Sequence, residues 1–172
     1  AEPRQGLATA NNDKYLRFWS EVARSESALH RSEENGELSK RWFPYQKGGA
    51  FRKWFGNHEL VIDWLGNGAA LKADPKAVIR NPGYYLKEGM TWTSLTVSSF
   101  NGRYCPEGFI FDSKGPVLFS RYGQPIKKIM AFLNSKVSAT FLRVLAPTMD
   151  FSQGPVGNVP VRAVVSQETS ED

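Results

Sequence analysis

The hydrophobic pattern changes at Pro125, and this change constrains the fold more than any other feature of the chain. Before Pro125, apolar residues form short runs, and Asp74-Pro75 and Asn81-Pro82-Gly83 exclude one long helix between residues 74 and 89. After it, apolar residues recur at helical spacing: Ile126, Ile129, Met130, Leu133, Val137, Phe141, Leu142 and Leu145. Asn134-Ser135 supplies N-cap residues in the middle, so two helices with a bend are expected. The pattern predicts an α+β fold with a β-rich half and a C-terminal helical pair.

Several segments of the first half have the composition of strands. Residues 15–22 fit a helix, with Tyr15, Phe18, Trp19 and Val22 on one face, as well as a strand, and the family resemblance given below favours the strand. We expect a short strand or helix start at 59–64 and a strand at 91–99. Residues 109–111 and 117–119, joined across 112–115, predict a hairpin. Residues 23–40 are polar and predict a surface loop, Gly66-Asn67-Gly68 predicts a turn, and residues 156–165 predict a last strand.

Residues 41–57 interleave aromatic rings with positive charges. The rings are Trp42, Phe43, Tyr45, Phe51, Trp54 and Phe55, and the cations are Arg41, Lys47, Arg52 and Lys53. Rings that stack and cations that neutralise phosphate are what a nucleic-acid surface requires. The alternative is that the rings belong to the core and the charges to the solvated face of a hairpin. The Gly48-Gly49 pair allows a sharp turn or a close approach of backbone to a partner.

The charge of the chain is unevenly distributed. Residues 40–128 hold fourteen Lys and Arg against six Asp and Glu, a net charge of +8, while the whole chain carries +5. Such an excess favours a polyanionic partner. The single cysteine excludes a disulfide framework and indicates a reducing, cytoplasmic compartment. No apolar run has the length of a membrane span and no signal peptide is visible, so no membrane partner is expected.

Four blocks of the sequence, in order, resemble the target-recognition (specificity) region of bacterial adenine-specific DNA methyltransferases. The similar groups are the type IIG restriction-modification enzymes and the PglX-like methyltransferases of BREX phage exclusion. The blocks are residues 5–12 with 15–22; residues 42–49 with 52–57; residues 89–92 with 103–104, 108–112 and 115; and residues 133–136 with 147–151 and 159–161. The second block, which begins Trp42-Phe43-Pro44-Tyr45, is the most specific. Ala10 stands where this family usually has Gly, so a positive φ at this position would strain the backbone.

The resemblance implies a fold like the DNA methylase specificity domain, with a curved β-rich recognition half. Residues 1–165 would be a target-recognition domain taken from a longer protein, and residues 166–172 an acidic tail or linker. The partners would be double-stranded DNA and the upstream methyltransferase domain of the same polypeptide. That domain would bind S-adenosylmethionine and methylate adenine N6, while the fragment itself would be non-catalytic and hold no cofactor. Whether the parent also cleaves DNA stays open.

The candidate DNA contacts divide by chemistry. Lys47, Arg52, Lys53 and Lys114 suit phosphate contacts. Arg41, Arg80, Arg103 and Gln46 have the fork or amide geometry for base edges. Tyr45 and Trp92 would stack or wedge near an extruded base.

Other patterns predict structure rather than chemistry. Asn81-Pro82-Gly83-Tyr84 resembles the Asn/Asp-Pro-Pro-Tyr loop of adenine methyltransferases but lacks the second Pro, so a turn is the better interpretation. His30, His58 and Cys105 form no ligand set for a metal in the sequence. Two other function classes remain: a protein-interaction module that docks the catalytic domain or a partner subunit, and, less favoured, an aromatic carbohydrate-binding module.

Overall fold

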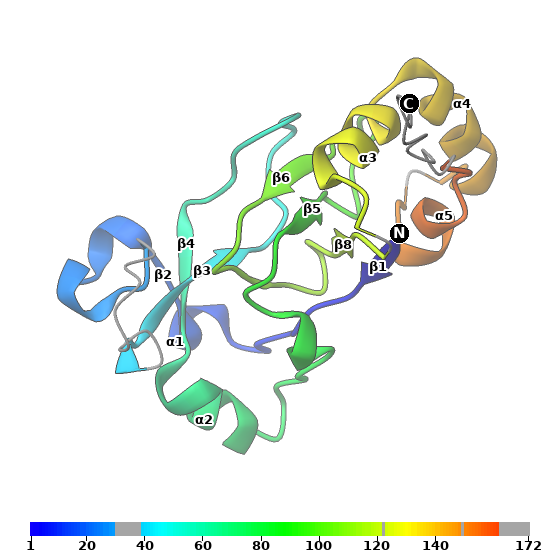
Figure 1. The fold of residues 1–172 in the computed structure, drawn as a ribbon. Coiled ribbons are helices and arrows are strands. Elements are labelled where there is room, and N and C mark those ends of the chain that lie inside the picture. Colours follow the sequence, from blue (N-terminus) through cyan, green and yellow to red (C-terminus); the bar gives the residue numbers. More distant parts are fainter. Residues whose placement is uncertain (30–38, 122, 149, 162–172) are drawn as a thin grey trace, which may run out of the picture.

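Two four-stranded sheets form the β-rich part of the molecule, and three helices lie together at one end (Figure 1). The computed structural model describes residues 1–29, 39–121, 123–148 and 150–161. Its strands are β1 (Glu2–Arg4), β2 (Leu16–Phe18), β3 (Trp42–Gln46), β4 (Leu60–Asp63), β5 (Gly89–Thr91), β6 (Arg103–Cys105), β7 (Ile110–Phe111) and β8 (Val117–Phe119). Its α-helices are α1 (Asn12–Tyr15), α2 (Leu65–Ala73), α3 (Ile126–Leu133), α4 (Lys136–Leu145) and α5 (Gln153–Gly157), with 3₁₀ turns at Trp19–Glu21 (η1), Arg24–Glu26 (η2) and Pro82–Tyr84 (η4). The predicted α+β class is confirmed.

The two sheets have different topologies. One has the order β1-β8-β5-β6 and is antiparallel throughout. The other has the order β2-β4-β3-β7, in which only the β3–β7 pair is parallel. The first sheet lies between two hydrophobic clusters. Val117 and Phe119 join the cluster around Phe43, Ile62 and Phe111 of the second sheet. Met90 and Leu118 belong to the cluster formed with α3, α4 and α5.

The predicted pair of C-terminal helices is confirmed, including the bend between them. Asn134 ends α3, and its side-chain amide donates to the Gly102 carbonyl at 2.8 Å while its Oδ1 accepts from Gly102 N at 3.0 Å. Ser135 is the N-cap of α4, because its Oγ accepts from the Ser138 amide at 3.2 Å. These capping bonds hold the helical pair against the end of β6.

Other predictions of turns and strands are also confirmed. Gly66, Asn67 and Gly68 have left-handed φ angles of 59°, 59° and 73°, so the predicted turn occupies the start of α2. Residues 60–63 form β4, the strand that was one of the two alternatives there. Within residues 15–22, only Leu16–Phe18 are a strand. Of the predicted loop 23–40, residues 30–38 lie outside the described residues, as do the acidic residues 166–172.

Three strand predictions are wrong. Residues 109–111 and 117–119 are not a hairpin: β7 pairs with β3, whereas β8 pairs with β1 and β5, so the chain crosses between the sheets. The Asp112 carboxylate turns the chain here by accepting from the Lys114 amide at 2.7 Å.

The second error concerns residues 91–99, where β5 ends at Thr91. The Thr93 amide donates to the Asn101 side chain at 2.8 Å, which takes the chain out of the ladder. The third concerns residues 156–165. Residues 153–157 form α5, and Val156 within it and Val159 just after it are both buried in the cluster of the C-terminal helices. Residues 162–165 lie outside the described residues.

Ala10 occupies the left-handed region, with a φ of 57°, immediately before the N-cap residue of α1. Because a Cβ disfavours this conformation, we expect Ala10→Gly to raise the free energy of unfolding by about 0.5–1 kcal/mol. The matched control is Ala131→Gly, the same exchange at an exposed position inside α3, which should lower it by about 1 kcal/mol. Urea unfolding would measure the change in the free energy of unfolding of each variant, which should be positive for Ala10→Gly and negative for Ala131→Gly. A decrease for Ala10→Gly would contradict the backbone strain at Ala10.

Candidate nucleic-acid interface

Strand β3 buries the first half of the tract of rings and cations. All five residues from Trp42 to Gln46 are buried. The Tyr45 hydroxyl donates to Asp112 Oδ2 at 2.7 Å, and burial together with this carboxylate raises the pKa of Tyr45 well above its ordinary value. Gln46 is fully buried, and neither polar atom of its side chain has a hydrogen-bond partner among the described residues. In this conformation neither Tyr45 nor Gln46 presents its side chain to the surface.

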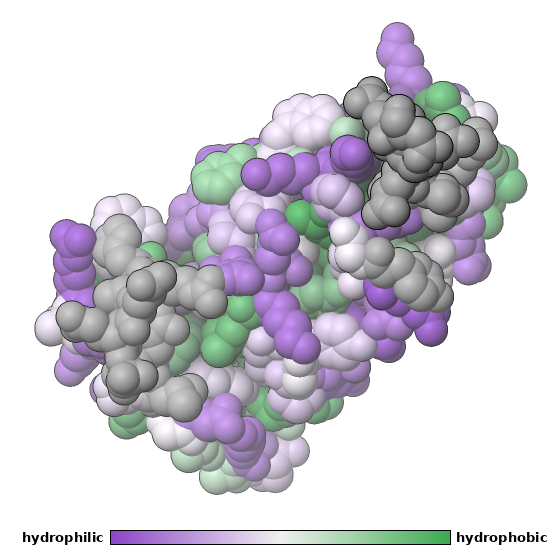
Figure 2. Space-filling model, viewed as in Figure 1, coloured by the Kyte–Doolittle hydropathy of each residue, from purple (hydrophilic) through white to green (hydrophobic). Residues whose placement is uncertain are grey.

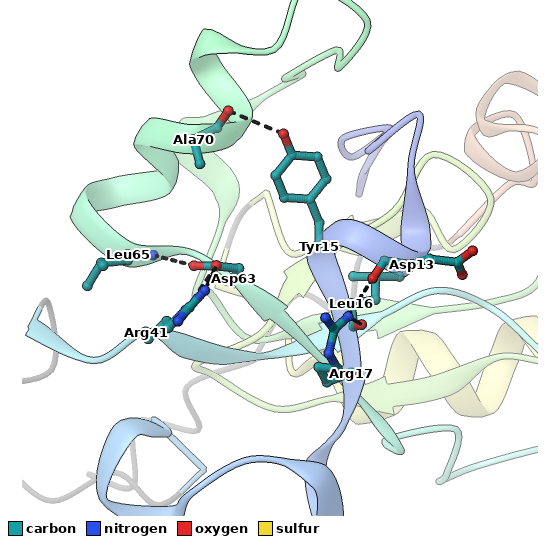
Figure 3. A network of polar contacts seen from close by, with 8 residues as sticks. All are labelled: Asp13, Tyr15, Leu16, Arg17, Arg41, Asp63, Leu65 and Ala70. Atoms are coloured by element: carbon teal, nitrogen blue, oxygen red, sulfur yellow. Dashed lines mark hydrogen bonds and ion pairs between the residues drawn. The ribbon is translucent and has the colours of Figure 1, made fainter.

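Arg41, immediately before β3, pairs with a carboxylate on the neighbouring strand. Its Nε and Nη2 both donate to Asp63 Oδ2, at 3.0 and 2.8 Å, and Figure 3 shows the guanidinium directed at this carboxylate. The hydrogen bond and the charge of Asp63 raise the pKa of Arg41. Asp63 also accepts from the Leu65 amide at 3.3 Å, so it is held in place beside Arg41. The side chain of Arg41 remains about half exposed, so the pair lies at the surface.

The second half of the tract forms the β3–β4 loop, residues 47–59, which extends beyond its sheet towards β6 (Figure 1). Gly48 and Gly49 have φ angles of +89° and +104° at the start of the loop, a backbone conformation that glycine adopts readily. Asn57 closes its base, because Nδ2 donates to the carbonyls of Gly48 at 2.8 Å and Ala50 at 2.9 Å. The conformation of the loop is therefore fixed by backbone and side-chain hydrogen bonds.

Residues 51–55, which we call the loop tip, expose their aromatic side chains. Phe51, Trp54 and Phe55 are 49%, 50% and 61% exposed. The tip also carries Arg52, which is exposed, and Lys53, which is half-buried. In the space-filling view, pale and green surface lies over the end of the β3–β4 loop, next to hydrophilic purple surface (Figure 2). The tip therefore brings together three of the six rings and two of the four cations of residues 41–57.

The backbone of the loop tip is attached to the edge strand of the other sheet. The Trp54 amide donates to the Gly102 carbonyl at 3.0 Å, and the Tyr104 amide donates to the Trp54 carbonyl at 2.8 Å. In this pairing Trp54 adopts a φ of 75°, which is rare for a residue with a bulky side chain. The tip therefore bridges the two sheets, and it covers the edge of β6.

Arg103 lies beneath the loop rather than at the surface. It is fully buried, and its Nη1 donates to the Asn101 carbonyl at 3.2 Å and to the Arg52 carbonyl at 3.4 Å. Its Nη2 contacts Thr93 Oγ1 at 3.4 Å, and this hydroxyl donates to the Gly49 carbonyl at 3.1 Å. Burial lowers the pKa of Arg103 to about 10. Through these contacts Arg103 supports the loop from the inside, directly at Arg52 in the tip and by way of Thr93 at Gly49 near its start.

The remaining candidate residues lie in three different places. Trp92 is fully buried, and its indole N–H donates to the Phe151 carbonyl at 2.6 Å. Lys114 is exposed near the loop, since its carbonyl lies close to Gly48. Lys47 is half-buried, and burial lowers its pKa while the carboxylates of Asp112 and Asp13 oppose this shift. Arg80 is exposed on the segment before η4, and no contact among the described residues joins it to the loop.

Two exposed rings beside the loop were absent from the sequence-predicted site. Phe18 and Trp19 are each 54% exposed, and the Trp19 amide donates to the Glu59 carbonyl at 2.9 Å. Trp19 and His58 line an open cavity of about 470 Å³ together with Ser20, Val22, Arg24 and Leu29. The adjacent aromatic residues Phe18 and Trp19 are visible in the sequence as a possible binding pair. Their exposure could not be predicted, because the spacing of residues 15–22 fits a helix and a strand equally.

The segment Asn81-Pro82-Gly83-Tyr84 is a turn, as predicted. Pro82–Tyr84 form η4, and the Asn81 side chain donates to the Gln5 carbonyl at 2.9 Å. The Tyr84 hydroxyl donates to Glu2 Oε2 at 2.9 Å, and its ring packs on Phe119 with the centroids 5.0 Å apart. The polar groups of this segment are therefore engaged in structural contacts.

Helix α4 presents apolar residues on its outer face. Val137, Phe141, Val144 and Leu145 are between 36% and 79% exposed, although their spacing is that of a packed helix face. Figure 2 shows hydrophobic residues at the margin of the molecule over this helix.

In the part of the chain that the structure describes, no group of three or more His, Cys, Asp or Glu residues is arranged so that it could hold a metal ion. The helices described there also fall short of the length and apolarity needed to cross a bilayer.

Almost the whole chain is similar to a segment of two curated bacterial proteins. It is 40% identical over 175 residues, and 98% of the chain, to the adenine-specific methyltransferase PglX of Lacticaseibacillus casei (strain Zhang). It is 37% identical over 160 residues, and 91% of the chain, to the adenine-specific methyltransferase BrxX of Escherichia coli O9:H4 (strain HS). The chain spans only 15% and 13% of the length of these relatives. No family model matches it. The chain is thus homologous to a segment of adenine-specific methyltransferases, and of the two groups that its sequence resembles, the PglX-like one is represented among these relatives.

Proposed function

We propose that this chain binds double-stranded DNA and reads its sequence for an adenine-N6 methyltransferase. Transfer of the methyl group from S-adenosylmethionine would take place in another part of the same polypeptide. The observation that carries the proposal is the loop tip, where three exposed rings and two cations meet on a chain homologous to part of adenine-specific methyltransferases. If the whole protein acts in restriction-modification or phage exclusion, this chain would contribute the recognition of DNA to that process.

Phosphate binding by the loop tip is supported by the weakness of its existing ion pair. Arg52 Nη1 lies 3.5 Å from Glu59 Oε1, and both side chains are about half exposed. Ion pairs of this kind contribute little to stability, because water and salt screen the two charges. A DNA phosphate can therefore replace Glu59 at small cost, and Lys53 is adjacent in the chain. Arg41 and its partner Asp63 form a second surface pair that a phosphate or a guanine edge would have to compete for.

The proposal divides the predicted contact residues into two groups. Arg41, Lys47, Arg52, Lys53, Arg80 and Lys114 are exposed or half-buried and are kept as candidate contacts. Tyr45, Gln46, Trp92 and Arg103 lie in the interior, where they support the two sheets and the loop. For Arg103 we propose a positioning role, since its guanidinium donates to the Arg52 carbonyl directly.

Salt dependence of DNA binding tests the proposal. The double variant Arg52→Ala/Lys53→Ala should bind mixed-sequence duplex more weakly, and its slope of log K against log salt should be shallower by about 0.9 for each phosphate that the variant no longer neutralises. The matched control is Lys72→Ala/Lys76→Ala, which removes the same charge on α2 and in the turn after it, far from the loop tip (Figure 1). Fluorescence anisotropy at several salt concentrations measures both slopes.

Equal slopes for the two double variants would contradict phosphate binding by the loop tip. If the parent chain shows no salt-sensitive binding, the second candidate function gains support: docking onto the methyltransferase domain of the same polypeptide. The exposed apolar face of α4 favours this candidate, because a helix face at packing spacing is normally covered. The two functions are compatible within one protein, since α4 and the loop tip belong to different parts of the molecule (Figure 1).

A further inference from the structure

The rings of the loop tip are poorly suited to reading base edges. Phe51 and Phe55 have no hydrogen-bonding atoms, and Trp54 has one donor and no acceptor. Discrimination between base pairs in the grooves depends on matched donors and acceptors. The flat faces of these rings interact instead with the flat faces of bases, by stacking on an end or entering between two steps.

Trp54 is held at the tip by its backbone. Its amide and carbonyl are both bonded to the chain around β6, at 3.0 and 2.8 Å, and Asn57 closes the loop base behind it. The left-handed φ of 75° costs free energy that glycine would avoid, so the loop keeps a bulky ring at a position that favours glycine. The ring is half exposed in the resulting position.

The other rings differ from Trp54 in their support. Phe55 packs edge-on against His58 with the ring centroids 4.5 Å apart, and His58 in turn packs on Phe109 at 4.8 Å. Among the described residues Trp54 makes no such ring contact. Arg52 and Lys53 precede it directly in the chain, so cations that can hold phosphates accompany a half-exposed ring at the same loop tip.

From this arrangement we infer that Trp54 enters the base stack of bound duplex DNA as an apolar wedge, with Arg52 and Lys53 holding the backbone beside it. This inference rests on the proposed function and specifies its mode of contact. A side chain that enters between base pairs unstacks them and kinks and unwinds the duplex. The contact therefore changes the shape of the DNA, which simple phosphate binding does not require.

Because Trp54 has a left-handed φ, its ring can be removed by a substitution that does not disturb the backbone of the loop. Trp54→Gly removes the ring while its φ stays favourable, so the loop should keep its conformation and thermal unfolding should be unchanged or occur at a higher temperature. Trp54→Asn removes the ring in the same way with another residue type that tolerates the left-handed region. Trp54→Phe keeps a ring and is the conservative rescue.

The experiment measures DNA unwinding, which needs no knowledge of the recognised sequence. Relaxed closed-circular plasmid is incubated with the chain and a topoisomerase, and its linking number is measured after the protein is removed. We expect the unsubstituted chain, called the parent in this experiment, and Trp54→Phe to lower the linking number. Trp54→Gly and Trp54→Asn should leave it unchanged at protein concentrations that give the same bound fraction, and they should bind roughly 5- to 100-fold more weakly, as expected for the removal of one stacked ring.

Each other result overturns the inference in a recognisable way. If Trp54→Gly lowers the linking number as the parent does, the wedge is wrong. If the parent binds plasmid with the expected salt dependence but leaves the linking number unchanged, the wedge is wrong and DNA binding stands. If the parent does not bind plasmid, the proposed function fails together with the wedge, and a protein partner for the exposed rings is favoured.

Discussion

Trp92→Ala is expected to lower the free energy of unfolding by about 3–5 kcal/mol, the usual cost of truncating a large buried aromatic residue to Ala. Trp92 is fully buried against Phe100, with the ring centroids 5.9 Å apart, in the cluster that joins β5 and β8 to the C-terminal helices. The variant also leaves the Phe151 carbonyl without the indole N–H that lies 2.6 Å from it. Because small domains are stable by only about 5–15 kcal/mol, a large part of the total would disappear.

Urea unfolding, followed by circular dichroism, measures this change. The control is Leu95→Ala, three residues further on, where the side chain is 66% exposed and the expected change is below about 1 kcal/mol. The measurement also separates the two roles that Trp92 has been given. An unfolding curve like that of the parent, combined with weaker DNA binding, would contradict the core position and restore Trp92 as a stacking residue.

Gly6→Ala brings an added Cβ closer to a neighbouring atom than the same change at any other glycine that the structure describes, so we expect it to be strongly destabilising. A Cβ at Gly6 would lie 1.8 Å from the carbonyl oxygen and 2.7 Å from Cδ2 of Phe111, and Phe111 is itself in the core. The neighbouring backbone cannot give way easily, because the Leu7 amide donates to the same carbonyl at 3.0 Å. We expect the two segments to separate and the free energy of unfolding to fall by about 3 kcal/mol or more.

Gly83→Ala is the matched control for this prediction. A Cβ at Gly83 has no neighbour within 4 Å, and its φ is outside the left-handed region, so the free energy of unfolding should change by less than about 0.5 kcal/mol. Thermal unfolding of the two variants side by side compares them. Equal midpoints would show that the first residues of the chain do not pack against β7.

The helical pair could be predicted from sequence because its signal is local. Residues three and four apart in α3 and α4 share a face whatever else the chain does, and Ser135 caps α4 through a neighbour three residues away. The turn at Gly66-Asn67-Gly68 and the 3₁₀ turn after Asn81 are local in the same sense. The strand pairings were not predictable in this way, since β7 and β8 are close in sequence but find partners in different sheets.

The candidate interface shows the same division. The sequence by itself determined that rings and cations are concentrated between residues 41 and 57, and that glycines would bend the chain there. Only the tertiary structure decided which rings are exposed. Tyr45 is enclosed in the cluster around β3, and Trp92 is enclosed between the first sheet and the C-terminal helices. Trp54 and Phe55 are placed at a loop tip that hydrogen bonds attach to a strand about fifty residues away. The physical reason is that the type of a side chain fixes its capacity to stack or to carry charge, whereas its exposure depends on segments distant in sequence that pack over it.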